Sequence, residues 1–236
     1  MNNTHLWQIW GYDPVQDDFR PFDSIQAWES QIDRNGAVKY LKNHLKKSLI
    51  NDFEPAYNVY VRDLRGIGYF ALLRIIFPVI DFLGALYQGN SRSQNAVQYM
   101  KDYMSKYNEN YKNIGDIIFL IFRHGLIHTQ MPKVLLFDNV NIGWVITYND
   151  SDHLVIGKRG LKPINIMIAP HQLYLDILNS IDDYIIDLLN ENKTDLLNNF
   201  KKGFIEMTIF YTKKGIMMNC NEGFSYLKKY FNDFIF

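Results

Sequence analysis

The sequence predicts a mainly α-helical protein, a bundle of helices with a small antiparallel β-insertion around residues 133–168. Apolar residues recur at three- and four-residue spacing before residue 130, and the same period returns over 170–212. Between these regions, short β-branched and aromatic runs are separated by Asn, Asp and Gly. We expect one domain, residues 1–236, with a helical core at about 35–130 and 170–212.

The bulk composition limits the class of protein. The chain has 236 residues, of which 47% are hydrophobic, so it can bury a sizeable core. Lys plus Arg equals Asp plus Glu at 25 each, so a uniformly basic nucleic-acid binder is not expected, although a local basic face is compatible with this total. Cys220 is the only cysteine, which excludes an internal disulfide and favours a reducing compartment. With no signal peptide in the N-terminal sequence, we expect a cytoplasmic protein.

The first expected helices differ in character. Residues 35–51 form an amphipathic helix with a basic outer face, followed by Pro55. The segment 63–88 is apolar almost all round and is expected to be central to the fold, with a kink at Pro78. Its apolar run is about the length of a membrane span, but the polar and proline residues inside it, Arg74, Pro78 and Asp81, favour a buried helix without a membrane partner.

Arg74 and Asp81 are seven residues apart, which places them on one face of that central helix across two turns. Two interpretations remain open. The two side chains form a buried pair that satisfies both charges, or Asp81 orients a catalytic group nearby.

The remaining elements follow from local patterns. A Gly-, Ser- and Asn-rich turn precedes a helix over 95–107, and a further helix covers 114–128. Short strand-like runs then predict three or four strands, at 133–139, 143–149, 153–157 and 164–169. Pro170 suits the first turn of the next helix, 170–192, which is followed by a helix over 193–212 and an aromatic tail expected to pack back on the body.

The stretch "IFRHGLIHTQMPK", residues 121–133, places Arg123, His124 and His128 in an otherwise apolar segment. A guanidinium can hold two phosphoryl oxygens, and an imidazole that titrates near neutrality can move a proton. His124 and His128 share a helix face, but no H-E-x-x-H pattern or nearby carboxylate accompanies them, so no metal site is predicted. The alternative is a helix end whose arginine and histidines bond to carbonyls and solvent.

"RHGLIH" resembles the Arg-x4-His motif of HEPN domains, with a polar residue directly after the arginine and apolar residues before it. In that family the motif lies on or at the end of a helix in an all-α bundle. The resemblance implies a metal-independent endoribonuclease that needs no cofactor, of the kind found in toxin–antitoxin modules, phage defence and RNA-guided ribonucleases. It also implies two motifs facing each other in a dimer.

Transferred to this chain, the resemblance assigns His128 as general base or acid at the RNA 2′-hydroxyl and Arg123 as the group that holds the scissile phosphate. His124 would orient the site, with Asp81 and Arg74 in support. A subgroup of the family carries a tyrosine two positions after the motif histidine, where it is modified with AMP. This chain has Gln130 there, so that control is not implied.

RNA contacts are expected from Lys133 and from the basic loop "GKRGLK", residues 157–162, which contains Lys158, Arg159 and Lys162. A solvated turn is the alternative for this loop. We expect a homodimer whose axis runs near the motif, with a protein antitoxin as a further possible partner. The rival function is a non-catalytic helical module that binds a protein or RNA.

Overall fold

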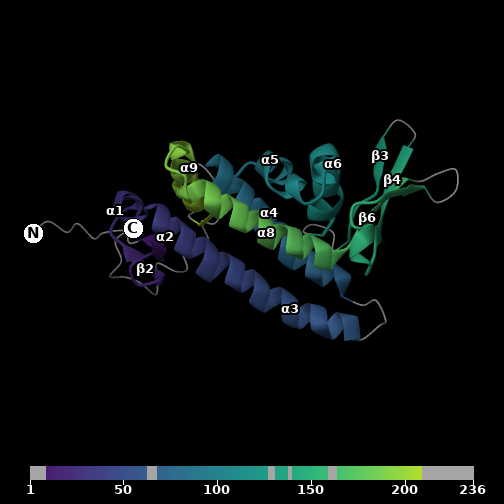
Figure 1. The fold of residues 1–236 in the computed structure, drawn as a ribbon, viewed down its shortest axis with the longest axis horizontal. Coiled ribbons are helices and arrows are strands. Elements are labelled where there is room, and N and C mark those ends of the chain that lie inside the picture. Colours follow the sequence, from purple (N-terminus) through teal and green to yellow (C-terminus); the bar gives the residue numbers. More distant parts are fainter. Residues whose placement is uncertain (1–8, 63–67, 127–130, 138–139, 159–163, 209–236) are drawn as a thin grey trace, which may run out of the picture.

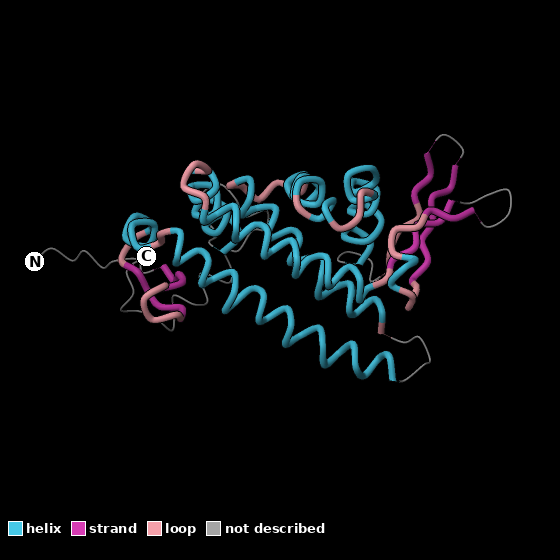
Figure 2. Tube along the Cα trace, in the orientation of Figure 1, coloured by secondary structure: helices cyan, strands magenta, loops and turns pink. Residues whose placement is uncertain are grey.

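The computed structural model confirms a mainly helical fold with small sheets. It describes residues 9–62, 68–126, 131–137, 140–158 and 164–208. Figure 2 shows that the strands gather at the two ends of the long axis, with the long helices between them.

One end of the molecule is an N-terminal hairpin with a short helix. Strands β1 (Ile9–Asp13) and β2 (Asp18–Phe22) pair antiparallel, and helix α1 (Ile25–Gln31) follows. The Ser24 side chain caps α1 by accepting the Ala27 N–H. The Trp28 indole is buried and donates to the Tyr12 carbonyl at 3.1 Å, which fixes the helix against the hairpin.

The first long helical unit is longer than the sequence suggested. Helix α2 (Arg34–Lys39), the π-helical turn η1 (Tyr40–Lys46) and helix α3 (Lys47–Arg62) follow one another without a break. The expected end before Pro55 is therefore wrong. Pro55 lies on an exposed face of α3, where the carbonyl that loses its helix partner can bond to water.

Helix α4 (Tyr69–Gln88) is the centre of the bundle, as the apolar segment predicted, and it contacts α3, α5, α8 and α9 (Figure 1). It continues through Pro78, which is exposed. By length and composition alone α4 could cross a membrane, but more than half of its most apolar window is buried inside the fold. Helix α9 packs closely against α4 at Gly203, where a Cβ atom would lie 2.0 Å from the Ala85 carbonyl oxygen.

A second set of shorter helices covers the other side of α4. Helix α5 (Gln94–Asp102) and the 3₁₀ turn η2 (Met104–Lys106) match the predicted helix closely. Helix α6 (Asn110–Ile118) begins before the predicted start and contains a non-helical residue, Ile114. It continues into the π-helical turn η3 (Phe119–His124), which carries the motif arginine; residues 125–126 are still helical, and residues 127–130 lie outside the described part of the chain.

The β-insertion is a four-stranded sheet in the order β3-β4-β6-β5, made of β3 (Leu135–Phe137), β4 (Val140–Ile146), β5 (Ile156–Lys158) and β6 (Ile164–Ile168). The expectation of a purely antiparallel sheet is wrong, because β4 and β6 pair in parallel. After β4 the chain does not form the neighbouring strand but crosses to the opposite edge of the sheet, where it forms β5. Strand β6 then fills the gap in the middle.

A buried anchor explains that path. His153 and Leu154 lie between β4 and β5, both are buried, and the Leu154 N–H donates to the Met167 carbonyl of β6 at 2.7 Å. The amides of Asn108 and Asn110, at the start of α6, donate to the carbonyls of these same two residues at 3.1 Å each. The connection is thereby pinned to the helical body, which carries the chain across β6.

The last described elements are helices α8 (Pro170–Leu189), with proline in its first turn as predicted, and α9 (Thr194–Thr208). Helix α8 lies against α4 and α2. The expected aromatic tail lies outside the described residues, as does Cys220.

Candidate active site

Arg123 sits in the last turn of η3 and forms an ion pair with Asp81 of α4, with 2.7 Å between Nε and Oδ2. The side chains of Arg123 and Asp81 are 24% and 13% exposed, so the pair lies at the surface of the core rather than inside it. The guanidinium also lies over the Phe119 ring, 5.6 Å from its centroid. Nε carries one N–H, and within the described residues the Nη groups have no hydrogen-bond partner. They are the donors that a phosphate would use.

The Asp81 carboxylate holds the arginine at an energetic cost. Burial raises its pKa above the usual range, and this effect exceeds the opposing influence of Arg123 and of His124. A carboxylate that is partly desolvated gains most from the Nε–H bond that it accepts, so the guanidinium is held in one orientation. This contact is the one that the sequence alternative requires, in which Asp81 orients a catalytic group; the catalytic role of Arg123 stays a prediction. Arg74 lies two turns away on the same face of α4 and is half-buried.

His124 is half-buried next to Arg123 and meets the Phe119 ring edge-on, with 6.3 Å between ring centroids. Its side chain lines a hollow of about 270 Å³ together with Asp116 and with Ser93 and Gln94 at the start of α5. The motif therefore borders an indentation of the surface between α5 and η3. A ligand in that hollow would contact His124 directly.

The glycine of the motif has a steric role. A Cβ atom at Gly125 would lie 2.4 Å from the Met131 carbonyl oxygen and 2.7 Å from the Lys133 nitrogen, because the chain folds back across the helix at this point. The Lys133 N–H donates to the Ile121 carbonyl at 2.8 Å. This return places the exposed Lys133 beside the turn that carries Arg123. One predicted RNA contact is thus brought to the motif.

The second group of predicted RNA contacts lies elsewhere. Lys158 ends strand β5 at the sheet edge opposite to β3, and its side chain is outside the described part of the molecule. Three strand spacings of about 4.8 Å separate the two edges, or roughly 14 Å. Lys133 leads into β3, so the fold does not put Lys133 and Lys158 side by side. Arg159, Lys162 and the motif residue His128 all lie outside the described residues.

Two further histidines have no partner that is apparent from the sequence, and the structure shows a partner for each. His171, at the start of α8, pairs through Nδ1 with Asp150 Oδ2 at 2.7 Å and stacks on Tyr57 with 4.8 Å between centroids. It is about one-third exposed, so it is an oriented imidazole within reach of solvent. Its described surroundings are acidic, however, because Glu54 bonds to the adjacent Tyr174 at 3.0 Å. An RNA phosphate would be better received beside Arg123.

His153 is fully enclosed, with Tyr111 at 2.7 Å from Nε2 and the Ala169 N–H at 3.1 Å from Nδ1. No local pattern could have indicated these contacts, because Asp150 and Tyr111 lie 21 and 42 residues from their histidines. Within the described ranges, neither histidine belongs to a group of three or more His, Cys, Asp or Glu side chains that could hold a metal ion.

Comparison of the chain with models of protein families, with curated proteins and with solved structures gave no match.

Proposed function

We propose that the protein is a metal-independent endoribonuclease of the HEPN type that cleaves RNA by internal attack of the 2′-hydroxyl. The observation that carries the proposal is the state of Arg123. Its Nε is fixed by Asp81, while its Nη donors bond to none of the described residues and lie at a surface bordered by a hollow. A fixed cation with spare parallel donors is the arrangement needed to bind a phosphate and its extra charge in the transition state.

The proposed step is a transesterification. The 2′-oxygen attacks phosphorus while His128 takes the 2′-hydroxyl proton, and Arg123 binds the phosphoryl oxygens as negative charge accumulates. The bond from phosphorus to the 5′-oxygen then breaks, and an acid returns a proton to that oxygen. The products are a 2′,3′-cyclic phosphate and a 5′-hydroxyl end. Water can later open the cyclic phosphate.

A homodimer supports this step, because one motif offers one imidazole of this kind, whereas the reaction needs both a base and an acid. An isologous interface near residues 123–128 would set each motif against its own copy. The family resemblance extends the proposal to a cytoplasmic role in toxicity or phage defence, restrained by a protein antitoxin.

The direct test is RNA cleavage in EDTA by the wild type, Arg123→Ala and His128→Ala. We expect each substitution to lower kcat/KM by about 100-fold or more, as for removal of one transition-state donor or one acid–base group. Arg20→Ala is the matched control, because Arg20 also pairs with a carboxylate, the buried Asp13, but in the N-terminal hairpin. His44→Ala is the control for the histidine. Both should retain cleavage in proportion to the folded fraction.

Cleavage that requires a divalent metal, or that survives both motif substitutions, would contradict the mechanism. Products with a 3′-hydroxyl end would do so as well.

The alternative function is a non-catalytic module that binds a protein. One observation favours it: the β3–β4 end of the sheet exposes several large apolar side chains, Val134, Leu136, Phe137 and Val140. If Arg123→Ala lowers thermal stability while purified wild-type protein cleaves no RNA, the ion pair is structural and this alternative is supported.

A further inference from the structure

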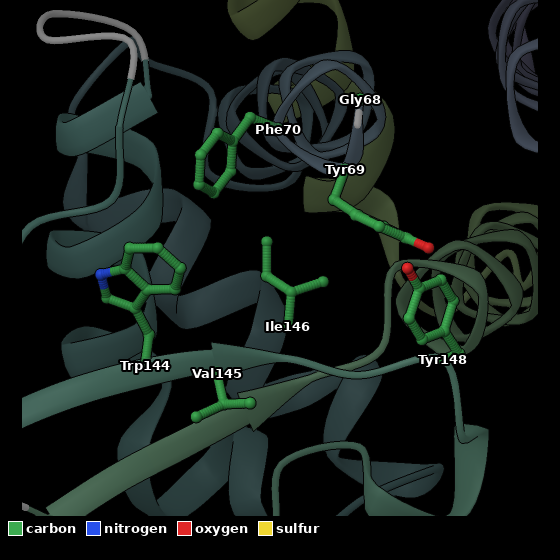
Figure 3. A pocket seen from close by; sticks show the side chains of 7 residues that line it. All are labelled: Gly68, Tyr69, Phe70, Trp144, Val145, Ile146 and Tyr148. Atoms are coloured by element: carbon green, nitrogen blue, oxygen red, sulfur yellow. The ribbon is translucent and has the colours of Figure 1, made fainter. Parts of the chain in front are cut away.

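A second hollow, of about 430 Å³, opens where the N-terminus of α4 meets strand β4. Four of its seven lining residues are aromatic: Tyr69, Phe70, Trp144 and Tyr148. Figure 3 shows Phe70 and Trp144 on one side, the two tyrosines on the other, and Ile146 between them. Volume and lining are those of a small-ligand pocket, with aromatic walls and few polar groups.

The aromatic walls are held by neighbours, so the hollow is a preformed feature. Phe70 and Trp144 meet edge-on at 5.5 Å between centroids, and Tyr69 and Tyr148 do so at 4.7 Å. Edge-on pairs leave ring faces available to a third ring. Phe122 packs between Trp144, at 6.4 Å, and Phe77, at 5.9 Å. Because Phe122 directly precedes Arg123, the wall of the hollow and the motif share one packed unit.

Two polar features in the hollow lack partners among the residues that the structure describes. Tyr69 is only 7% exposed, and within the described residues its hydroxyl has no hydrogen-bond partner. A buried hydroxyl in that state costs about 1–3 kcal/mol, which a ligand that displaced the half-exposed Tyr148 could recover. The second feature is the N-terminus of α4, where Gly68 is the cap residue and supplies no side-chain bond. Among the described residues, none accepts a hydrogen bond from the backbone N–H groups of Tyr69 and Phe70, which can therefore bind an anion.

The hollow is aligned with Arg123 along α4. Phe70 and Asp81 are 11 residues apart, which is about three helical turns, so both lie on nearly the same face about 16 Å apart. Arg74 lies between them on that face. A strand that followed this face would pass from the aromatic hollow over Arg74 to the Arg123–Asp81 pair. The separation of about 16 Å between Phe70 and Asp81 accommodates a few nucleotides of an extended strand.

We propose that this hollow binds one base of the RNA strand whose phosphate Arg123 holds, with the adjoining phosphate at the N-terminus of α4. The inference rests on the proposed ribonuclease function. Stacking on aromatic side chains is tolerant of base identity and contributes about 1–3 kcal/mol per base. The subsite would therefore set how tightly and in which register the RNA lies, several nucleotides from the bond that is cleaved.

The test measures base binding apart from cleavage. Quenching of tryptophan fluorescence by AMP, and anisotropy of a labelled single-stranded RNA, are recorded on the His128→Ala protein and on the same protein with a second substitution. Tyr148→Ala and Phe70→Leu should each weaken RNA binding by about 10-fold, the equivalent of roughly 1.4 kcal/mol, and reduce AMP quenching. Phe137→Ala is the matched control, because Phe137 is a 70% exposed aromatic residue on β3, away from the hollow. It should leave both signals unchanged.

The Trp144→Phe variant separates folding from binding, because it keeps an aromatic wall while removing the reporter. It should retain RNA affinity and lose most of the AMP quenching. Unchanged RNA affinity in the folded Tyr148→Ala and Phe70→Leu proteins would overturn the inference. Stronger quenching by N-acetylphenylalanine amide than by AMP would overturn it in favour of a peptide ligand. Tyr148-dependent AMP binding without Arg123-dependent cleavage would instead retain the base subsite and reject the ribonuclease.

Discussion

The Arg123–Asp81 pair and the His153–Tyr111–Asp176 cluster both place ionisable side chains against the helical core, but they use their hydrogen-bonding groups to different degrees. In the cluster, the Ala169 N–H donates to His153 Nδ1, so the imidazole proton lies on Nε2 and is donated to the Tyr111 oxygen. The Tyr111 hydroxyl in turn donates to Asp176 Oδ2 at 2.8 Å.

The cluster is also closed at its other end, where the Gln172 amide donates to Asp176 Oδ1 at 2.7 Å. His153 and Asp176 are both about 1% exposed in their side chains. Every polar side-chain atom of His153, Tyr111 and Asp176 has a hydrogen-bond partner, and no solvent or ligand can reach them. The cluster therefore joins α6, the β4–β5 connection and α8. In the Arg123 pair, by contrast, the Nη donors bond to no residue that the structure describes, and the side chain is 24% exposed. An unusual set of ionisable residues therefore indicates chemistry only where some of its hydrogen-bonding groups are left for a ligand.

The sharpest test of this comparison is at Asp81. Asp81→Ala removes the acceptor that holds the Arg123 Nε–H, so we expect kcat to fall by about 100-fold, the scale of a misplaced catalytic group. Asp81→Asn keeps an oxygen at that position and should recover most of the loss, with little change in KM. A structural role alone would lower stability in both variants and leave kcat per folded molecule unchanged. Steady-state cleavage corrected for the folded fraction distinguishes these outcomes.

The same test at the buried cluster should give the reverse result. Tyr111→Phe removes one hydroxyl and leaves His153 Nε2 and Asp176 Oδ2 without their partner in a sealed site. We expect a loss of about 2 kcal/mol in the free energy of unfolding, measured by urea denaturation, with cleavage per folded molecule unchanged. Tyr148→Phe is the control for stability, because that side chain is 53% exposed and should cost under about 0.5 kcal/mol. Lost cleavage in folded Tyr111→Phe would break the distinction between the two regions.

The sequence anticipated the elements that depend on local pattern. The helix that begins at Pro170 and the apolar centre, α4, were both predicted because periodicity and proline placement are local signals. Pro55 misled, since an exposed proline in a helix is tolerated when water serves the freed carbonyl. The parallel pairing of β4 with β6 could not be predicted, because it depends on where the buried His153–Leu154 anchor carries the chain.

The same limit applies to the sites. Arg123 and Asp81 were each singled out, but their pairing joins residues 42 apart and only the fold reveals it. The hollow beside Trp144 had no sequence signal, because its rings come from two elements more than 70 residues apart that each look like ordinary core. A constellation formed by tertiary contact is not encoded by spacing along the chain.

The buried cluster also imposes a dependence of stability on pH. Burial lowers the pKa of His153 to about 3, whereas in the unfolded chain it titrates near 6.5. Between these values the unfolded state binds a proton that the folded state excludes. The contribution of the neutral His153 to the free energy of unfolding is therefore fully present above about pH 6.5 and is lost as pH falls toward 3. The slope from one histidine is at most about 1.4 kcal/mol per pH unit.

Asp176 opposes this trend, because burial raises its pKa and the folded state then holds more protons above about 3.8. The wild-type profile is therefore a sum of opposing slopes, and the His153→Gln variant is needed to isolate the histidine. We expect urea denaturation at pH 5, 6 and 7 to show that the free energy of unfolding falls toward pH 5 more steeply in the wild type than in the variant. The difference in slope should be at most that of one bound proton, about 1.4 kcal/mol per pH unit. Parallel profiles would mean that His153 is charged or solvated in the folded state, and the cluster could then no longer be counted as architecture in contrast to the Arg123 site.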